Sequence, residues 1–199
     1  MLRRVLWATN EPSHFLAPIS VKATDHEALA VDNGGDAAMR RIIVVGCAGS
    51  GKTALARRLA ERTGLPLICL DAIWDPNWSE RNVAMFRSLL AEAHAGDGWI
   101  SDGNFAVATF DIRMPRADLV VWLERPRLGC AWRAITRVLR PGETHKLRDL
   151  PRVLAFIWNF DRLNRPKIEA ARMAHGAKVP VVRLGSRREI ADFEASLQS

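Results

Sequence analysis

Gly46-Cys47-Ala48-Gly49-Ser50-Gly51-Lys52-Thr53 is the stretch that decides the fold of this chain of 199 residues. Its spacing, G-x-x-x-x-G-K-[ST], is the pattern of a phosphate-binding loop. The stretch follows an apolar run of the β type and precedes a helix-like segment, which is the context that the pattern needs. We therefore expect a strand over Arg41–Val45 and a helix over Lys52–Thr63.

The residue types of this loop suit the binding of a nucleoside triphosphate. Glycines let the backbone curl so that successive N–H groups point at an anion, and the following helix adds its positive N-terminal end. Lys52 is expected to reach the outer phosphates of ATP, and Thr53 to offer its hydroxyl to Mg²⁺. The remaining nucleotide-binding positions are Gly46, Ala48, Gly49, Ser50 and Gly51.

Composition excludes several other classes of protein. Hydrophobic residues make up 48% and charged residues 26%, as in soluble globular proteins, and no apolar run is long enough to span a membrane. The three cysteines, Cys47, Cys69 and Cys130, are odd in number and widely spaced. They favour reduced thiols and a cytoplasmic location over a disulfide framework or a zinc site. Cys47 lies near a helix N-terminus, which favours its thiolate, although it also suits the loop simply as a small residue.

The net charge of +7 is concentrated downstream of the loop. A nucleotide ligand explains this basic charge well, nucleic acid explains it less specifically, and for any single residue a solvated basic surface is the alternative. No DNA-reading motif is evident, and the oligomeric state stays open.

Residues 1–38 do not resemble part of the folded domain. They are rich in turn-forming residues and weakly periodic, so we expect a disordered N-terminal extension followed by one domain over 39–199. The alternative is a short amphipathic segment around residues 21–30 that docks on the domain.

Strands and helices alternate after the loop. Further strands are expected over Leu67–Leu70, Trp99–Ser101, Asp118–Leu123 and Val179–Leu184. Helices are expected over Arg81–Ala95, Arg127–Leu139, Leu150–Ala174 (interrupted or kinked at Pro166) and Arg187–Leu197. This order predicts an α/β fold of the P-loop NTPase type, a three-layer sandwich with a five-stranded parallel sheet and a helical lid region.

Polar residues that follow the strands are the candidate site, because ligands of open α/β sheets bind at the carboxyl ends of the strands. Asp102 is the expected second residue for Mg²⁺, with an Asp-Gly turn as its alternative and Glu124 as its competitor. Asp71 is expected to orient or deprotonate the hydroxyl of an acceptor, unless it is only a cap or turn residue. The expected acceptor-binding set is Asp71, Trp74, Asn104 and Arg113, although packing is the simpler role for Trp74.

Three arginines share one face of the helix expected after the fourth strand. Arg133, Arg137 and Arg140 are spaced by four and three residues, and we expect them to close over a transferred phosphoryl group. A lid is expected around residues 133–150. A solvated helix face is the alternative. The aromatic residues Phe156, Trp158 and Phe160 are expected in the core.

Residues 40–197 resemble the P-loop kinase-like family of DNA topology modulation proteins (FlaR-related), which are relatives of adenylate kinase. The resemblance rests on the loop and on Leu70-Asp71-Ala72-Ile73-Trp74, Trp99-Ile100-Ser101-Asp102-Gly103-Asn104-Phe105 and Arg165-Pro166-Lys167-Ile168. It implies a nucleoside- or nucleotide-kinase-like core. Adenylate kinases continue Asp-Gly with Phe-Pro-Arg, which is missing here, and Asp71 looks more like the small-metabolite kinases that act on shikimate or gluconate.

Together these residues predict an ATP-binding, Mg²⁺-dependent phosphotransferase with an unidentified acceptor. Its catalytic residues would be Lys52, Asp71, Arg133, Arg137 and Arg140. The alternatives are a nucleotide-dependent regulatory or DNA-topology-modulating protein without a small acceptor, and a nucleotide-binding protein without turnover.

Overall fold

The computed structural model describes residues 39–74, 80–139 and 147–196. The prediction of a disordered extension concerns residues 1–38, which lie outside these residues. Residues 140–146, which include Arg140 and the middle of the lid expected around residues 133–150, also lie outside them.

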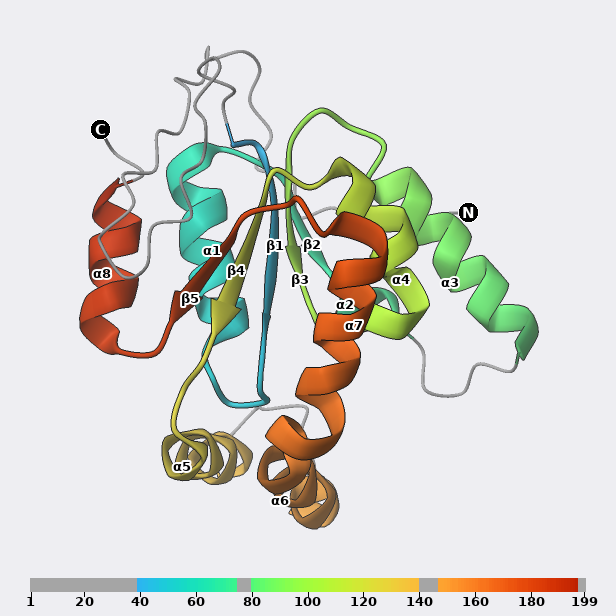
Figure 1. The fold of residues 1–199 in the computed structure, drawn as a ribbon. Coiled ribbons are helices and arrows are strands. Elements are labelled where there is room, and N and C mark those ends of the chain that lie inside the picture. Colours follow the sequence, from blue (N-terminus) through green and yellow to red (C-terminus); the bar gives the residue numbers. More distant parts are fainter. Residues whose placement is uncertain (1–38, 75–79, 140–146, 197–199) are drawn as a thin grey trace.

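A five-stranded parallel sheet in the order β2-β3-β1-β4-β5 forms the centre of the molecule (Figure 1). The strands are β1 (Arg41–Gly46), β2 (Leu67–Cys69), β3 (Trp99–Asp102), β4 (Leu119–Leu123) and β5 (Val181–Leu184). All neighbouring pairs are parallel, and β1 registers Val44 opposite Asp102 of β3 and Val121 of β4. The predicted α/β class and five-stranded parallel sheet are confirmed.

Eight α-helices are described, and five of them cover the two faces of the sheet. They are α1 (Lys52–Thr63), α2 (Leu70–Ile73), α3 (Glu80–Ala93), α4 (Ala106–Arg113), α5 (Arg127–Val138), α6 (Leu150–Asn159), α7 (Arg165–Gly176) and α8 (Arg187–Ser196). In Figure 1, α1 and α8 lie on one side of the sheet and α3, α4 and α7 on the other, while α5 and α6 lie beyond its carboxyl edge. None of the described helices is long and apolar enough to cross a membrane.

The two faces of β1 explain why its sequence is continuously apolar. Ile42 and Val44 pack with side chains of α1 and α8, whereas Ile43 and Val45 pack with side chains of α3, α4 and α7. All four are fully buried, because helices cover both faces of a parallel sheet. The phosphate-binding loop begins at the carboxyl end of this buried central strand.

The structure differs from the sequence-based elements mainly between residues 105 and 117 and after 150. The sequence pattern assigned no element to the first segment, where α4 and a 3₁₀ turn over Met114–Arg116 form. The expected helix over 150–174 is divided into α6, a π-helical turn over Phe160–Asn164, and α7. Pro166 lies in the first turn of α7, where its missing N–H costs little.

Candidate functional site

The loop leaves the sheet at the point where β1 lies between β3 and β4. Gly51 has a φ of 101° and precedes α1, and Gly49 has a φ of 73°. A Cβ on Gly49 would lie 2.3 Å from the backbone oxygen of Cys130 on α5. Glycine is therefore required at position 49 both by the backbone conformation and by the close approach of α5.

Hydrogen bonds to its backbone hold the loop in place. The amide of Asn104 pairs with both backbone groups of Gly46, accepting from N at 3.0 Å and donating to O at 2.9 Å. Lys52 Nζ donates to the oxygen of Cys47 at 2.9 Å. Arg133 Nε of α5 donates to the oxygen of Gly49. The loop is thus shaped before any ligand binds.

Thr53 and Asp102 meet beside the loop, where the sequence predicted the two metal ligands. Thr53 Oγ1 donates to Asp102 Oδ2 at 2.6 Å, and Asp102 is 2% exposed. Among the described side chains, the buried Asp102 Oδ1 and Ser50 Oγ have no hydrogen-bond partner. Buried polar atoms are normally paired, so a partner is missing here. A hydroxyl and a free carboxylate oxygen beside a phosphate cradle suit Mg²⁺, which takes oxygen ligands.

Burial changes the protonation equilibria of this pair and of the loop lysine. It raises the pKa of Asp102, while the hydrogen bond from Thr53 and the charge of Lys52 lower it. It also lowers the pKa of Lys52, against the charges of Asp102 and Asp71. Both shifts reflect the cost of charge in a poorly solvated place, which a cation and phosphates would offset.

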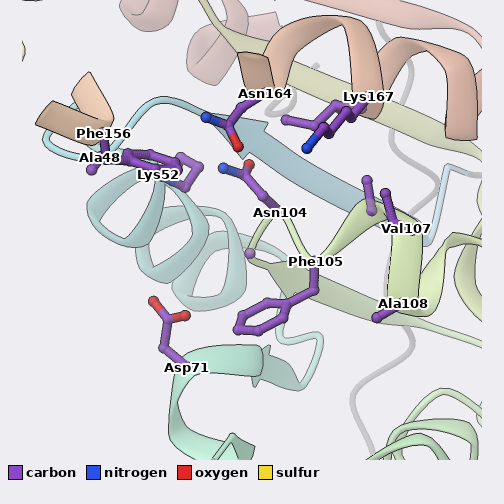
Figure 2. A pocket seen from close by; sticks show the side chains of 13 residues that line it. Ala48, Lys52, Asp71, Asn104, Phe105, Val107, Ala108, Phe156, Asn164 and Lys167 are labelled. Carbon is purple, nitrogen blue, oxygen red and sulfur yellow. The ribbon is translucent and has the colours of Figure 1, made fainter. Parts of the chain in front are cut away.

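A cavity of about 460 Å³ opens beside the loop (Figure 2). Its polar lining residues come from α1, α2, the turn after β3, the π-helical turn and α7: Lys52, Asp71, Asn104, Asn164 and Lys167. Apolar side chains form the rest of its wall, and they come mainly from the start of α4 and from α6 and α7: Ala48, Phe105, Ala106, Val107, Ala108, Phe156 and Ile168. This volume suits a small organic molecule.

Asp71 and Trp74 have different places in the structure. Asp71 is exposed, lies in the first turn of α2 and lines the cavity. Trp74 does not line it; its ring packs against Phe86 and Phe105, with centroids 5.3 and 5.6 Å apart. The expectation that Trp74 faces an acceptor is therefore corrected, because its ring packs in an aromatic cluster and does not line the cavity. Asn104 does line the cavity, but both ends of its amide already bind Gly46.

Arg113 is the clearest correction. Its side chain is 0% exposed and does not reach the cavity, so it cannot face an acceptor as predicted. Its guanidinium instead donates to four neutral acceptors: Thr109 Oγ1, Ser101 Oγ, and the backbone oxygens of Gly103 and Asn104. Burial lowers its pKa to about 9. Arg113 thereby fixes the turn that carries Asn104.

His94, just after α3, extends this buried network through Ser101. Its Nδ1 donates to the oxygen of Leu90 at 2.7 Å, so its Nε2 accepts from Ser101 Oγ at 2.9 Å. Its ring also lies 4.6 Å from that of Trp99 in an edge-on arrangement. Burial lowers the pKa of His94 to about 4, so the ring is neutral at pH 7.

The three arginines expected to close over a phosphoryl group differ in their surroundings. Arg133 contacts the loop, Arg137 is exposed, and Arg140 lies outside the described residues. Glu124, the competing metal ligand, instead pairs with Arg165 and Arg183. Asp102, and not Glu124, is therefore the carboxylate that lies beside Thr53.

The pKa of the loop residue Cys47 shifts in the direction opposite to the one expected from the sequence. A hydrogen bond with Cys130 and burial raise the pKa of Cys47, whereas the same hydrogen bond and nearby Arg133 lower the pKa of Cys130 to about 6. The thiolate is therefore favoured on α5 rather than in the loop. All three cysteines are free.

Sequence reasoning missed the cavity wall that α6 and α7 supply. Phe156 was expected in the core but lines the cavity, Trp158 is 62% exposed, and only Phe160 is buried. Asn164, Lys167 and Ile168 share one helical face by their spacing of three and four. That spacing was a signal, but nothing in the sequence brings the face to the loop.

Comparison with solved structures relates the fold to kinases. A shikimate kinase from Acinetobacter baumannii, solved with shikimate, is 16% identical over 80% of this chain and 92% of its own, with a TM-score of 0.53. A sugar kinase from Janibacter sp. is 20% identical over 80% and 93%, with a TM-score of 0.50. A gluconokinase from Sinorhizobium meliloti is 18% identical over 80% and 90%, with a TM-score of 0.48.

No family model and no curated protein matches the chain, so the resemblance to topology modulation proteins stays a prediction. The solved structures share less than a quarter of their residues with it, and they establish the fold alone. The chain has the α/β fold of the P-loop kinases.

Proposed function

We propose that this protein is an ATP-dependent phosphotransferase that acts on a small hydroxylated acceptor. One observation carries the proposal: Lys52 of the phosphate loop and Asp71 of α2 line the same cavity. A phosphate-binding cation and a carboxylate that can accept a hydroxyl proton are the two groups that phosphoryl transfer to an alcohol needs. The kinase fold of the structural neighbours supports the same reaction class.

In the proposed reaction, some residues position the two substrates and others neutralise charge on the phosphates. The loop N–H groups and Lys52 bind the phosphates, and Asp71 orients the acceptor hydroxyl. The hydroxyl oxygen forms a bond to the γ-phosphorus, the bond from that phosphorus to the β,γ-bridging oxygen breaks, and ADP leaves with that oxygen. The hydroxyl proton passes to Asp71. Arg133, at the loop, offsets charge on the phosphates.

A magnesium ion would bind at Thr53 and Asp102. The unpaired Asp102 Oδ1 fits this role, and a single carboxylate suffices because Mg²⁺ is usually held by one or two carboxylates together with substrate phosphates. When bound, the ion would neutralise charge on the phosphate oxygens.

The test is acceptor-dependent release of ADP from ATP across a panel of nucleosides, nucleotides and hydroxylated metabolites. At least one member should raise the rate far above that with ATP alone. A panel with no such member would contradict the proposal. Tight, sequence-selective DNA binding at physiological salt, without acceptor turnover, would instead favour the regulatory alternative.

A further inference from the structure

Lys167 lines the cavity, and its positive charge has no role in the reaction as proposed above. The residue lies in the first turn of α7 and lines the cavity with Asn164. Figure 2 shows both side chains entering from the side of α7, across the cavity from Asp71. Three charged residues line the cavity in the described part of the chain, and of these Lys52 is assigned to phosphate and Asp71 to the hydroxyl.

The carboxylates near the start of α7 already have cationic partners. Glu124 pairs with Arg165, Asp161 with Arg127, and Glu169 with Arg172. Within the described ranges, no hydrogen bond or ion pair joins the ammonium of Lys167 to another residue. Lys167 is exposed, so its ammonium is free to contact an anion that enters the cavity.

We infer that the acceptor carries an anionic group, a carboxylate or a phosphate monoester, which Lys167 binds while Asp71 holds the hydroxyl to be phosphorylated. This inference rests on the proposed function. The cavity wall also includes the apolar side chains of Phe105, Val107 and Phe156, so the body of the acceptor has an apolar face such as a ring. The acceptor is a hydroxylated acid of this shape or a nucleoside monophosphate.

Matched acceptors that differ only in charge test the inference. We would compare cyclic hydroxy acids with their methyl esters, and nucleoside monophosphates with the parent nucleosides, by release of ADP. The charged member of a pair should be the better substrate, and the two arms separate carboxylate from phosphate. Turnover of neutral members alone would overturn the inference and leave the proposed function standing, whereas no turnover at all would overturn both.

Lys167→Gln is the informative variant, and Lys178→Gln, at an exposed lysine just beyond α7, is its matched control. Lys167→Gln should raise KM for the charged acceptor about tenfold or more, because a charge-assisted contact is lost. It should leave KM for ATP unchanged and remove the preference for the charged member of a pair. An increase in KM for ATP, or an equal effect of Lys178→Gln, would overturn the assignment of Lys167 to the acceptor.

Discussion

The two sides of the cavity differ in how fully their polar groups are engaged by the protein itself. On the loop side, Lys52 binds the oxygen of Cys47, Asn104 clamps Gly46, and Thr53 binds Asp102. On the other side, no hydrogen bond or ion pair from the described residues engages the side chain of Asp71 or Lys167. The side proposed to bind the nucleotide is preorganised and the side proposed to bind the acceptor is open, so only the latter depends on a ligand to complete its contacts.

Replacement of Lys52 by alanine gives the largest expected effect, since it removes the cation of the preorganised side. Acceptor-dependent kcat/KM should fall about 10³-fold, or ~4 kcal/mol of transition-state stabilisation. Initial rates of ADP release measure this, and circular dichroism checks that the variant folds. A variant with unchanged turnover would refute the assignment of the loop.

Asp71→Asn tests the open side with an isosteric change. The turnover number should fall about 10²-fold because the hydroxyl proton loses its acceptor. Thermal stability should stay nearly the same, because Asp71 is exposed and no side-chain hydrogen bond or ion pair with another described residue is removed. A lower melting temperature with normal turnover would reverse this expectation and make Asp71 a structural residue.

The pH dependence of stability tests the buried network that supports the loop side. The pKa of His94 is about 4 in the folded protein and near 6.5 in the unfolded chain, so between these values only the unfolded chain binds the proton. The contribution of His94 is therefore complete above pH 6.5. It should be lost as the pH falls toward 4, by about 3 kcal/mol of unfolding free energy.

Urea unfolding between pH 4 and 7 measures this loss, with His94→Gln as the comparison. The variant should lack the part of the pH dependence that His94 supplies. Parallel curves for the two proteins would show that His94 is not the group responsible.

Arg113→Met gives the smallest expected effect. It leaves the backbone oxygens of Gly103 and Asn104 without their donor, but it also removes a buried charge, so a net loss of about 2 kcal/mol is expected. Because Asn104 clamps Gly46, KM for ATP should rise as well. Urea unfolding and ATP titration measure the two effects, and a variant with higher stability would show that desolvation of the guanidinium dominates.

Most of the sheet was predictable because β1 and β4 are buried on both faces and therefore read as continuous apolar runs. Asp102 and Asp71 were recognisable as candidate site residues because each comes at or just after the end of a strand. Arg113 and Trp74 were misassigned for one reason: a residue type suited to binding a ligand is equally suited to a buried network or an aromatic cluster. Only burial and partners distinguish these roles.

The sequence by itself determined the phosphate loop, because its glycines, Lys52 and Thr53 act through local backbone geometry within one strand–loop–helix unit. Only the tertiary structure decided which residues line the cavity wall opposite the phosphate loop. Lys167 is more than a hundred residues from the loop, and the packing of α6 and α7 beyond the sheet edge places it on the cavity wall. Long-range packing depends on the sum of many weak apolar contacts, so no local pattern in the chain encodes it.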